Sequence, residues 1–581
     1  MFPFPGMRFP FRLFLCACCL ILSTGAPAAD QAPKPRSVLP AGTPADIEEL
    51  KTIQKALRDA LPKILPSIVE IYAAGNHGSG VFVNRDGCIY SAAHVTRQPG
   101  TKLQITLSGS ERIEGRTIIQ DTETDAGIAF LPPPFTTSRP AVPIASAPPV
   151  VGEWVFALGH PGGYDAARGP VVRLGRVVSV KDGMLQTDCK VIGGDSGGPL
   201  FNMKGELVGI HSKVGTGLED NVHIPIAVFT ALQEQAPSEP SAVQDSTGLE
   251  FDKRLNGREV LASVAPVRQD IQNASVVFYD GHDSIAYGIP VSSDGDVTTK
   301  SSEVPEGKTY LVRAGNQSYA EAICIARDPS TDLALFHIPG MQMPQPRFRE
   351  EPPPIGTIVV SNGSTTRKDR RIRLGTVGAT TRSIPRKSDL VPYMGIAFEP
   401  PCSIAEVVSG TPADQAGLKP GDTVISLAGH PVSSLEDLGP AMQDKKPGDA
   451  LPISVSRKGA RIDATMHLAA RSAFVKDEDA PDPNEDINGR VSSRRDNFPM
   501  VIQHDTPLQP SMAGGPLMDL DGNIIGLNIA RANRAETFAL PIRLVLATYR
   551  RMKQQAKTPS NSPSDGISSS TNPSPLPTLK Q

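Results

Sequence analysis

Three short stretches carry the residue types that together can cleave an acyl bond. They are SAAHV with His94, TDAGIAFL with Asp125 and GDSGGPL with Ser196. A histidine can take the proton of a serine hydroxyl, and an aspartate can hold the imidazole in the required tautomer. The glycines around Ser196 permit a tight turn whose N–H groups converge on one point, where the negative charge of a tetrahedral intermediate would develop.

The same frame occurs a second time without its nucleophile. SMAGGPL at 511 places Ala513 where the first copy has Ser196. Other marks repeat in the same order, such as SIVEIY at 67 with SVVFYD at 275, and TDAGIAFL at 124 with TDLALFHI at 331. The aligned positions of the second copy hold Ser302, Asp332 and Ala513, so only the aspartate survives. We therefore expect two copies of one domain, the second unable to transfer acyl groups.

The elements that must position these residues are short and rich in β-branched residues. From Ser67 to about Ala231, Val/Ile-rich runs alternate with Gly, Asp and Pro, which is typical of an all-β barrel or sandwich. The chain order His, Asp, Ser is that of the chymotrypsin-type barrels, and not of subtilisins or α/β-hydrolases. Ahead of the strands, Thr43 and Pro44 predict the N-cap and first residue of an amphipathic helix that continues to Pro62.

A separate signature lies inside the second copy. The marks LGRVVSV and MLQTD stand at 174 and 184, whereas their counterparts LGTVGAT and VIQHD stand at 374 and 501, which indicates an insertion. Within it, YMGIAFEP at 393 and SGTPADQAGLKPGD at 409 look like a PDZ domain of the type found in bacterial envelope proteases. Such domains capture a peptide C-terminus on backbone N–H groups of one loop, which would be Tyr393, Met394, Gly395 and Ile396. The alternative is a PDZ fold retained only as a spacer.

The first copy resembles the HtrA/DegP family of exported serine proteases. The resemblance spans residues 60–235 and rests on GSGVFV, AAHV, TDAGIAFL, LGHPGG, LGRVVSV and QTDCKVIGGDSGGPL. It implies a mainly β, chymotrypsin-like double barrel with His94 as general base, Asp125 as its orienting partner and Ser196 as nucleophile. The N–H groups of Gly194 and Ser196 would form the oxyanion hole.

The resemblance also implies an activity. It is ATP-independent endoproteolysis of unfolded or damaged envelope proteins, assisted by peptide binding at the PDZ domain. The alternative is a non-proteolytic chaperone or peptide-binding scaffold whose triad is intact but latent. A homo-oligomer is left open, because a PDZ domain inside a degenerate barrel departs from the family, in which such modules usually follow an active barrel.

The residues before the nucleophile also depart from the family. Asp195 stands where the family usually has asparagine, and Lys190 lies six residues before Ser196. Trypsin-like folds often set primary specificity at this position, so a cation there would favour an acidic or polar substrate side chain. The alternative interpretation is an exposed strand lysine.

These marks divide the chain at definite boundaries. The expected parts are a signal peptide at 1–29, a leader and amphipathic helix at 30–63, an active trypsin-like serine protease domain at 64–235, a linker at 236–250, a degenerate protease-like domain at 251–392 and 490–552, an inserted PDZ domain at 393–472, and a disordered tail at 553–581.

The N-terminus predicts export. Arg8 and Arg12 precede the apolar run LFLCACCLIL, and STGAPAAD predicts signal-peptide cleavage near Ala28 or Ala29, giving a soluble protein of the periplasm or cell envelope. A lipoprotein signal at Cys18 is the alternative.

Composition and spacing argue against several ligand classes. A net charge of −3 from 58 basic and 61 acidic residues gives no overall basic field for nucleic acid. No pair among the four cysteines that follow the signal has zinc-site spacing, so we expect no metal and no cofactor. The expected partners are unfolded protein or peptide substrates, and peptide C-termini at the PDZ domain. Four cysteines follow the signal, and their scatter favours buried, unpaired thiols, although three pairings are open: Cys88, Cys189, Cys324 and Cys402.

Overall fold

The computed structural model describes residues 42–132, 141–215, 217–234, 246–315, 317–361, 372–442, 445–475 and 489–557. The expected signal peptide, the first part of the linker and most of the expected tail lie outside the described residues.

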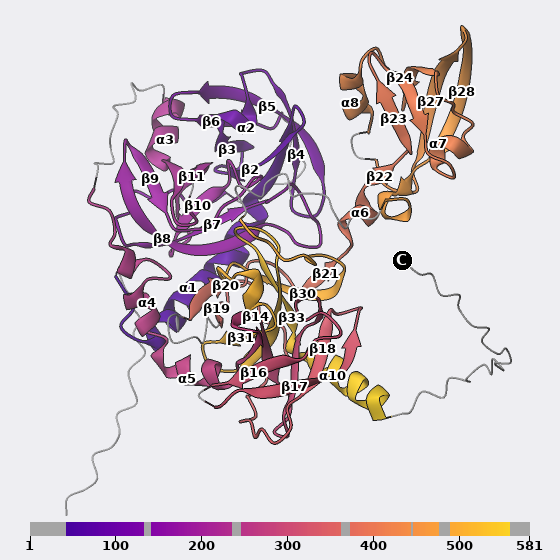
Figure 1. The fold of residues 1–581 in the computed structure, drawn as a ribbon. Coiled ribbons are helices and arrows are strands. Elements are labelled where there is room, and N and C mark those ends of the chain that lie inside the picture. Colours follow the sequence, from indigo (N-terminus) through magenta and orange to yellow (C-terminus); the bar gives the residue numbers. More distant parts are fainter. Residues whose placement is uncertain are drawn as a thin grey trace, which may run out of the picture. The chain divides into compact units, whose positions relative to one another are not determined.

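The first copy forms two closed antiparallel barrels of six strands each (Figure 1). The first barrel has the order β1 (Ile68–Ala73), β2 (Asn76–Phe82), β3 (Cys88–Ala92), β6 (Ala126–Phe130), β5 (Arg112–Asp121) and β4 (Lys102–Thr106). The second has the order β10 (Pro199–Asn202), β11 (Leu207–Val214), β12 (Asn221–Pro225), β9 (Met184–Thr187), β8 (Val171–Lys181) and β7 (Trp154–Gly159). Two helices accompany them, α2 (Ala93–Thr96) and α3 (Ile226–Glu234). The expected chymotrypsin-like double barrel is confirmed.

The second copy repeats the first of these barrels strand for strand and the second with one difference. Its closed barrel has the order β13 (Val276–Asp280), β14 (Asp283–Pro290), β15 (Asp296–Lys300), β18 (Leu333–His337), β17 (Ala320–Asp328) and β16 (Tyr310–Ala314). A seven-stranded sheet follows, with the order β20 (Arg373–Thr376), β19 (Ile358–Ser361), β31 (Pro516–Asp519), β32 (Ile524–Arg531), β33 (Thr537–Pro541), β30 (Phe498–His504) and β21 (Arg382–Ile384). In this sheet β20 and β21 together take the place of β8. The helices are α4 (Arg258–Ala262), α5 (Ala265–Asn273), α6 (Lys387–Leu390) and α10 (Ile542–Lys557).

The PDZ fold lies between β21 and β30 in the chain. Its sheet has the order β23 (Ile396–Glu399), β24 (Ser403–Val407), β25 (Thr423–Leu427), β27 (Ala450–Arg457) and β28 (Ala460–His467), with β26 (His430–Pro431) beside β25. Its helices are α7 (Pro412–Gln415) and α8 (Leu438–Met442). Strands β22 (Pro392–Tyr393) and β29 (Ala469–Ala470) pair where the insertion begins and ends. The fold has a hydrophobic core of its own, so it can be a folding unit.

Helix α1 (Ile47–Ile64) begins and ends later than the sequence suggests. Its N-cap is Asp46, whose carboxylate accepts a backbone N–H of the first turn, while the Thr43 hydroxyl accepts a hydrogen bond from Arg176 at 3.3 Å. The expected cap at Thr43 is therefore wrong. Pro62 lies inside the helix and not at its end. A proline in the last turn removes only one hydrogen bond, and buried apolar residues on both sides of it hold the turn in place.

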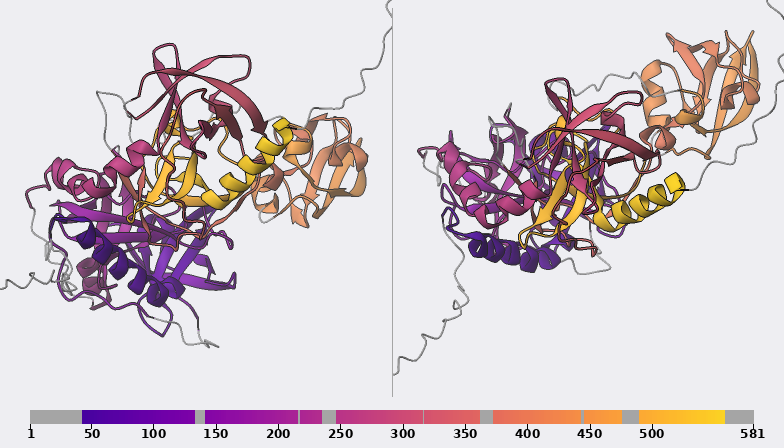
Figure 2. Two further views of the ribbon diagram at one scale, coloured as in Figure 1. Left: turned by 90° about the horizontal axis from the view of Figure 1, so that it is seen from below. Right: turned by 60° about the horizontal axis from the view of Figure 1, so that its bottom comes forward.

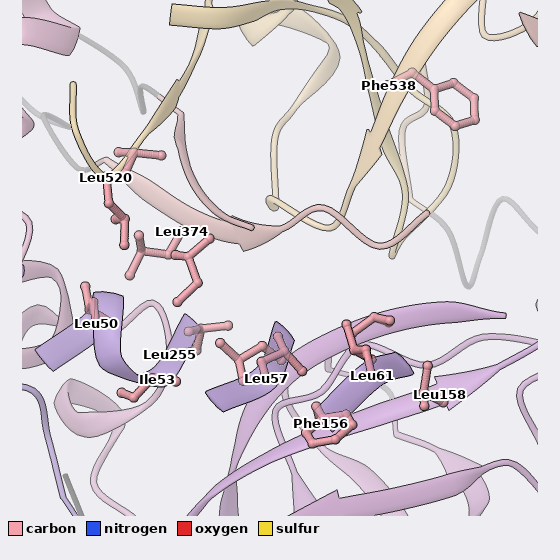
Figure 3. Packing of buried hydrophobic residues seen from close by; sticks show 14 of the residues in the cluster. Leu50, Ile53, Leu57, Leu61, Phe156, Leu158, Leu255, Leu374, Leu520 and Phe538 are labelled. Carbon is pink, nitrogen blue, oxygen red and sulfur yellow. The ribbon is translucent and has the colours of Figure 1, made fainter. Parts of the chain in front are cut away.

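The apolar face of α1 joins the two copies in one hydrophobic core. Leu50, Ile53 and Leu57 are fully buried on this face. They share a cluster with Phe156 of the first copy and Leu374 of the second (Figure 3). Burying a leucine side chain stabilises a fold by about 1.5–3 kcal/mol, so α1 contributes to both copies at once.

Two expected boundaries differ from the structure. Residues 553–557 continue α10, the yellow helix in Figure 2. Lys553 forms an ion pair with Asp296 of β15 at 2.6 Å, so a tail beginning at 553 is wrong. At the end of the linker, the Leu249 N–H donates to the Val178 carbonyl of β8 at 2.6 Å. Both stretches are held by contacts with residues far away in sequence.

The described cysteines are unpaired. Three are buried, as the sequence favours, whereas Cys324 is exposed on β17. None of the described helices is long and apolar enough to cross a membrane.

Candidate active site

His94 and Asp125 come together because their flanking strands pair. His94 lies in α2 directly after β3, and Asp125 directly precedes β6, which pairs antiparallel with β3. The His94 Nδ1 atom lies 2.9 Å from Asp125 Oδ2, and the His94 backbone N–H donates to Oδ1 at 3.0 Å. The backbone of Asp125 has φ of 64°, an uncommon value for a residue with a side chain. The two hydrogen bonds hold the carboxylate in this conformation and fix the imidazole.

Ser212 completes the surroundings of the carboxylate and was missed in the sequence. Its hydroxyl, on β11, donates to Asp125 Oδ2 at 2.6 Å. Burial alone would raise the pKa of the Asp125 carboxyl, but the hydrogen bonds from His94 and Ser212 bring this pKa below its ordinary value. Asp125 therefore stays ionised and can stabilise an imidazolium on His94. Only the short sequence GIHSKV at the end of an apolar strand could have indicated Ser212.

The turn that carries Ser196 adjoins this pair. The Ser196 carbonyl accepts the Ser79 N–H at 2.8 Å, and the Gly197 N–H donates to the His211 carbonyl at 2.8 Å. Gly197 has φ of 81°, and a Cβ on it would lie 2.1 Å from the Ser91 hydroxyl, so the turn requires glycine. Among the described residues, the Ser196 hydroxyl makes no hydrogen bond, and its contact with His94 is not formed. Such contacts often tighten only when substrate binds.

At Gly78 the helix that carries His94 and the turn that carries Ser196 approach one another. A Cβ on this residue of β2 would lie 2.5 Å from the Val95 side chain and 3.2 Å from the Ser196 carbonyl oxygen. Val95 follows His94 in α2, so the helix and the turn meet across one glycine. The arrangement places Ser196 beside the His94–Asp125 pair.

The peptide groups ahead of Ser196 are oriented for an anion. The Gly193 carbonyl accepts the Gly162 N–H at 2.9 Å, and because a trans peptide is planar, the Gly194 N–H points the opposite way. The Gly194 carbonyl accepts the Ser79 hydroxyl at 2.8 Å. Within the described parts of the chain, neither the Gly194 N–H nor the Ser196 N–H has a hydrogen-bond partner. Both remain available to a developing oxyanion.

Asp195 is anchored by a cation that sequence reasoning missed. Its carboxylate lies 2.9 Å from Arg173 Nη1 and accepts the Ile192 N–H at 2.9 Å, with both charged side chains 1% exposed. Burial raises the pKa of the Asp195 carboxyl, and the nearby guanidinium opposes that rise. The only sequence signal is a charge at Arg173 within the apolar run VVRLGRVVSV. The pair fixes the residue that lies between Gly194 and Ser196 in the chain.

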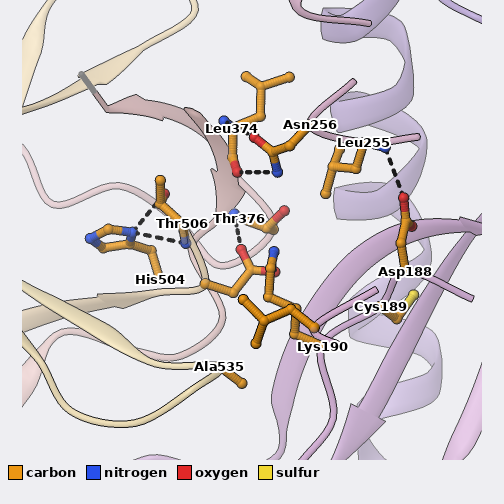
Figure 4. Close-up of polar contacts among 12 residues, drawn as sticks. Asp188, Cys189, Lys190, Leu255, Asn256, Leu374, Thr376, His504, Thr506 and Ala535 are labelled. Atoms are coloured by element: carbon orange, nitrogen blue, oxygen red, sulfur yellow. Dashed lines mark hydrogen bonds and ion pairs between the residues drawn. The ribbon is translucent and has the colours of Figure 1, made fainter. Parts of the chain in front are cut away.

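Lys190 is not an exposed strand residue. Its side chain is 3% exposed, and its ammonium lies 3.7 Å from the carboxylate of Asp505 in the second copy. The Asp505 carboxylate also accepts the Thr376 N–H at 2.5 Å (Figure 4). The exposed interpretation is therefore wrong, because the second copy covers this position. As a specificity candidate Lys190 remains a prediction, with its charge directed at a residue of the second copy.

The second copy repeats backbone hydrogen bonds of the site with different side chains. Ser302 occupies the place of the histidine, and its N–H and hydroxyl donate to the Asp332 carboxylate at 2.9 and 2.8 Å. The Ala513 carbonyl accepts the Tyr287 N–H at 2.8 Å, as Ser196 does from Ser79. A Cβ on Gly514 would lie 1.8 Å from the Tyr287 carbonyl, which explains why GGPL persists without a nucleophile.

The PDZ loop directs its carbonyl groups inward. The Met394 carbonyl accepts the Ala413 N–H at 3.0 Å, and the Gly395 carbonyl accepts the Val408 N–H at 2.9 Å. By peptide planarity the N–H groups of Gly395 and Ile396 point the other way. Ile396 begins β23, which is the edge strand of its sheet. This geometry suits β-augmentation by an extended peptide. Tyr393 instead lies in β22, paired with Ala469.

Comparisons with known proteins agree with this description. The chain matches the trypsin-like peptidase domain family over residues 78–210 and the PDZ domain family over residues 392–468. It is 24% identical over 416 residues to a probable periplasmic serine endoprotease DegP-like of Pseudomonas putida, covering 68% of this chain and 79% of that protein. It is 26% identical over 419 residues to the protein of that name from Ectopseudomonas mendocina, covering 68% and 80%.

A solved structure also matches. The crystal structure of the serine endoprotease from Yersinia pestis covers 71% of this chain and 97% of that chain, at 17% identity and a TM-score of 0.28. The sequence and domain matches confirm the HtrA/DegP-like resemblance of this chain.

Proposed function

We propose that this chain is an exported, ATP-independent serine endopeptidase of the HtrA type that cleaves unfolded or damaged proteins of the periplasm or cell envelope. The observation that carries the proposal is the hydrogen-bonded His94–Asp125 pair beside a turn that presents Ser196 and two unpaired N–H groups. The names of the DegP-like relatives support the reaction and the compartment. The mature chain would begin after signal cleavage near Ala28 or Ala29.

In the proposed mechanism Ser196 attacks the scissile carbonyl. His94 takes the serine proton and later donates it to the leaving amine, while Asp125 keeps the imidazole oriented and stabilises its charged form. The Gly194 and Ser196 N–H groups hold the oxyanion of the tetrahedral intermediate. A water activated by His94 then releases the acyl group. The PDZ domain would add peptide C-termini at the edge of β23, through the N–H groups of Gly395 and Ile396.

A fluorophosphonate probe and an unfolded model protein test this proposal on the purified full chain. We expect the wild-type chain to be labelled and to cleave, and Ser196→Ala to lose both. A half-exposed hydroxyl without a hydrogen bond contributes little to stability, so the thermal transition should be nearly unchanged. Cleavage by Ser196→Ala at the wild-type rate would refute the assignment. A wild-type chain that is never labelled would favour the non-proteolytic scaffold.

A further inference from the structure

Arg534 of the second copy donates hydrogen bonds to the backbone of the first copy at Gly215 and Gly217, here called the Arg534-bound segment. It lies in the turn between β32 and β33, and its side chain is buried, with 4% exposed. Its Nη1 donates to the Gly215 carbonyl at 3.1 Å and its Nη2 to the Gly217 carbonyl at 2.6 Å. One planar guanidinium thus holds two carbonyls of a glycine-containing stretch that would otherwise have wide conformational freedom.

The Arg534-bound segment is continuous in sequence with residues of the proposed active site. It directly follows β11, where Ser212 contacts Asp125 and the His211 carbonyl accepts the Gly197 N–H. The pairing of β10 with β11 ends at Pro199 and Ile210, and His211 bonds to the turn through Gly197 and Gly198. From Ser212 onward, β12 is the only described strand that pairs with β11. The other edge of β11 runs beside the nucleophile turn. An extended substrate could pair with the backbone there.

The second copy also contacts the segment that precedes the nucleophile turn. Asp505 faces the Lys190 ammonium at 3.7 Å, and both side chains are 3% exposed. Asn221 connects the segment around Lys190 to the Arg534-bound segment. Its side-chain amide donates to the Cys189 carbonyl at 2.7 Å and to the Leu218 carbonyl at 3.1 Å. Residues of the second copy therefore contact both the segment around Lys190 and the Arg534-bound segment.

A third contact adds to this support. The Val172 N–H of β8 donates to the Gly378 carbonyl at 2.9 Å, and the Thr380 hydroxyl donates to the Ala167 carbonyl at 2.8 Å. β8 is also the strand that carries Arg173, the counter-ion of Asp195.

We infer that the degenerate copy is a built-in support of the first copy's substrate-binding segments, and that Arg534 is a positioning residue for cleavage. The inference rests on the proposed function. Arg534 acts through the Gly215 and Gly217 carbonyls, which it binds at 3.1 and 2.6 Å. This gives the second copy a role that needs neither a histidine nor a serine of its own.

The test compares Arg534→Ala with Arg534→Lys, using the full chain. For Arg534→Ala we expect kcat/KM on a peptide spanning several residues before the scissile bond to fall about tenfold, because a charged donor to two carbonyls is lost. Labelling by a small fluorophosphonate, which needs only the nucleophile, base and oxyanion hole, should stay unchanged. Amides of residues 213–221 should exchange hydrogen faster. Arg534→Lys should recover only part of the lost kcat/KM, because an ammonium keeps a charged donor but lacks the planar fork that reaches both carbonyls.

Controls separate this inference from the proposed function and from general unfolding. Arg543→Ala, at an exposed site of α10, should behave like wild type. Asp505→Asn keeps an acceptor for the Thr376 N–H and should show the pattern of Arg534→Ala. Unchanged kinetics and exchange in Arg534→Ala would overturn the inference, as would an equal loss of labelling and cleavage with faster exchange throughout the first copy. A wild-type chain that neither labels nor cleaves would refute the proposed function and with it a role of Arg534 in cleavage, while faster exchange of residues 213–221 in Arg534→Ala would still show that the second copy supports this segment.

Discussion

The ion pair between Arg173 and Asp195 lies one residue before the proposed nucleophile and is shielded from water. Replacing one partner of a buried pair leaves an uncompensated charge, which costs about 3–5 kcal/mol. We expect Arg173→Met to lower the free energy of urea unfolding by about this amount. The double variant Arg173→Met/Asp195→Asn should recover most of the loss, because no charge is left unpaired and an acceptor for the Ile192 N–H remains. Wild-type stability in Arg173→Met would contradict an ionic pair.

Buried histidines predict sensitivity to acid. Burial lowers the pKa of His223 to about 3 and that of His211 well below its ordinary value, so both rings are neutral near pH 7. A neutral His211 that donates from Nε2 to the Leu158 carbonyl accepts at Nδ1 from His223 Nδ1, 2.8 Å away, and His223 Nε2 then accepts from the Thr187 hydroxyl. Burial likewise lowers the pKa of His160 to about 3.

Below pH 6.5 these histidines become protonated in the unfolded chain but stay neutral in the folded chain. His223 and His160 therefore each remove about 1.4 kcal/mol of stability per pH unit as the pH falls from 6.5 to about 3. His160 is suited to a test, because its ring nitrogens are buried without a hydrogen-bond partner among the described residues. We expect His160→Phe to make urea stability fall less steeply between pH 7 and pH 5 than in wild type. Parallel pH profiles of the two proteins would show that His160 is not held neutral.

At the scale of elements, the two copies allow a test of whether the backbone of the serine turn is sufficient for reactivity without a histidine. Ala513→Ser in a Ser196→Ala background restores a hydroxyl on a turn whose backbone matches the first one. Ser302 still stands in the place of the base, and its own hydroxyl is bonded to Asp332 at 2.8 Å. We expect no fluorophosphonate labelling, because nothing takes the serine proton. Labelling at 513 would mean that another group can act as base.

The elements of the site could be predicted from sequence where neighbouring residues encode them. The small residues around His94, the strand after Asp125 and the glycine turn at Ser196 each form a contiguous motif, and the repeat located the degenerate copy. The burial of Lys190 could not be predicted, since its partner Asp505 belongs to the other copy. Arg173 was hidden for a similar reason, because one charge in an apolar strand does not indicate its partner. The start of α1 was misplaced because Thr43 and Asp46 are both good caps.

At the scale of the whole molecule, the two copies share a large hydrophobic cluster in addition to smaller clusters of their own, and the PDZ fold has a separate core. Apolar residues of α1, the first copy and the second copy form a single cluster. The core of the PDZ fold is composed of its own residues, including Cys402, Leu418 and Leu451. The barrels should therefore unfold together, while the insertion can be removed without opening their core.

The PDZ fold is tethered at both ends, and this predicts how its removal affects cleavage. The Arg471 N–H donates to the Val391 carbonyl at 3.0 Å, so a short Gly/Ser loop can replace residues 392–470 and close the chain. Two tethers restrict a module more than one flexible linker does, because both must close at once. A docked substrate end would then raise the effective concentration of the rest of that chain near Ser196, without new contacts at the site.

We therefore expect the shortened chain to cleave long unfolded proteins more slowly than wild type and to cleave short chromogenic peptides at the wild-type rate. Initial rates on both substrate classes, measured at equal concentrations of fluorophosphonate-reactive sites, check this. Equal loss on both classes would indicate that the insertion acts on the first copy's active site or its folding. Wild-type rates on both would leave the PDZ fold as a spacer. A peptide that ends in a free carboxylate should slow cleavage of the long substrate only when residues 392–470 are present, because only then does it compete for the edge of β23.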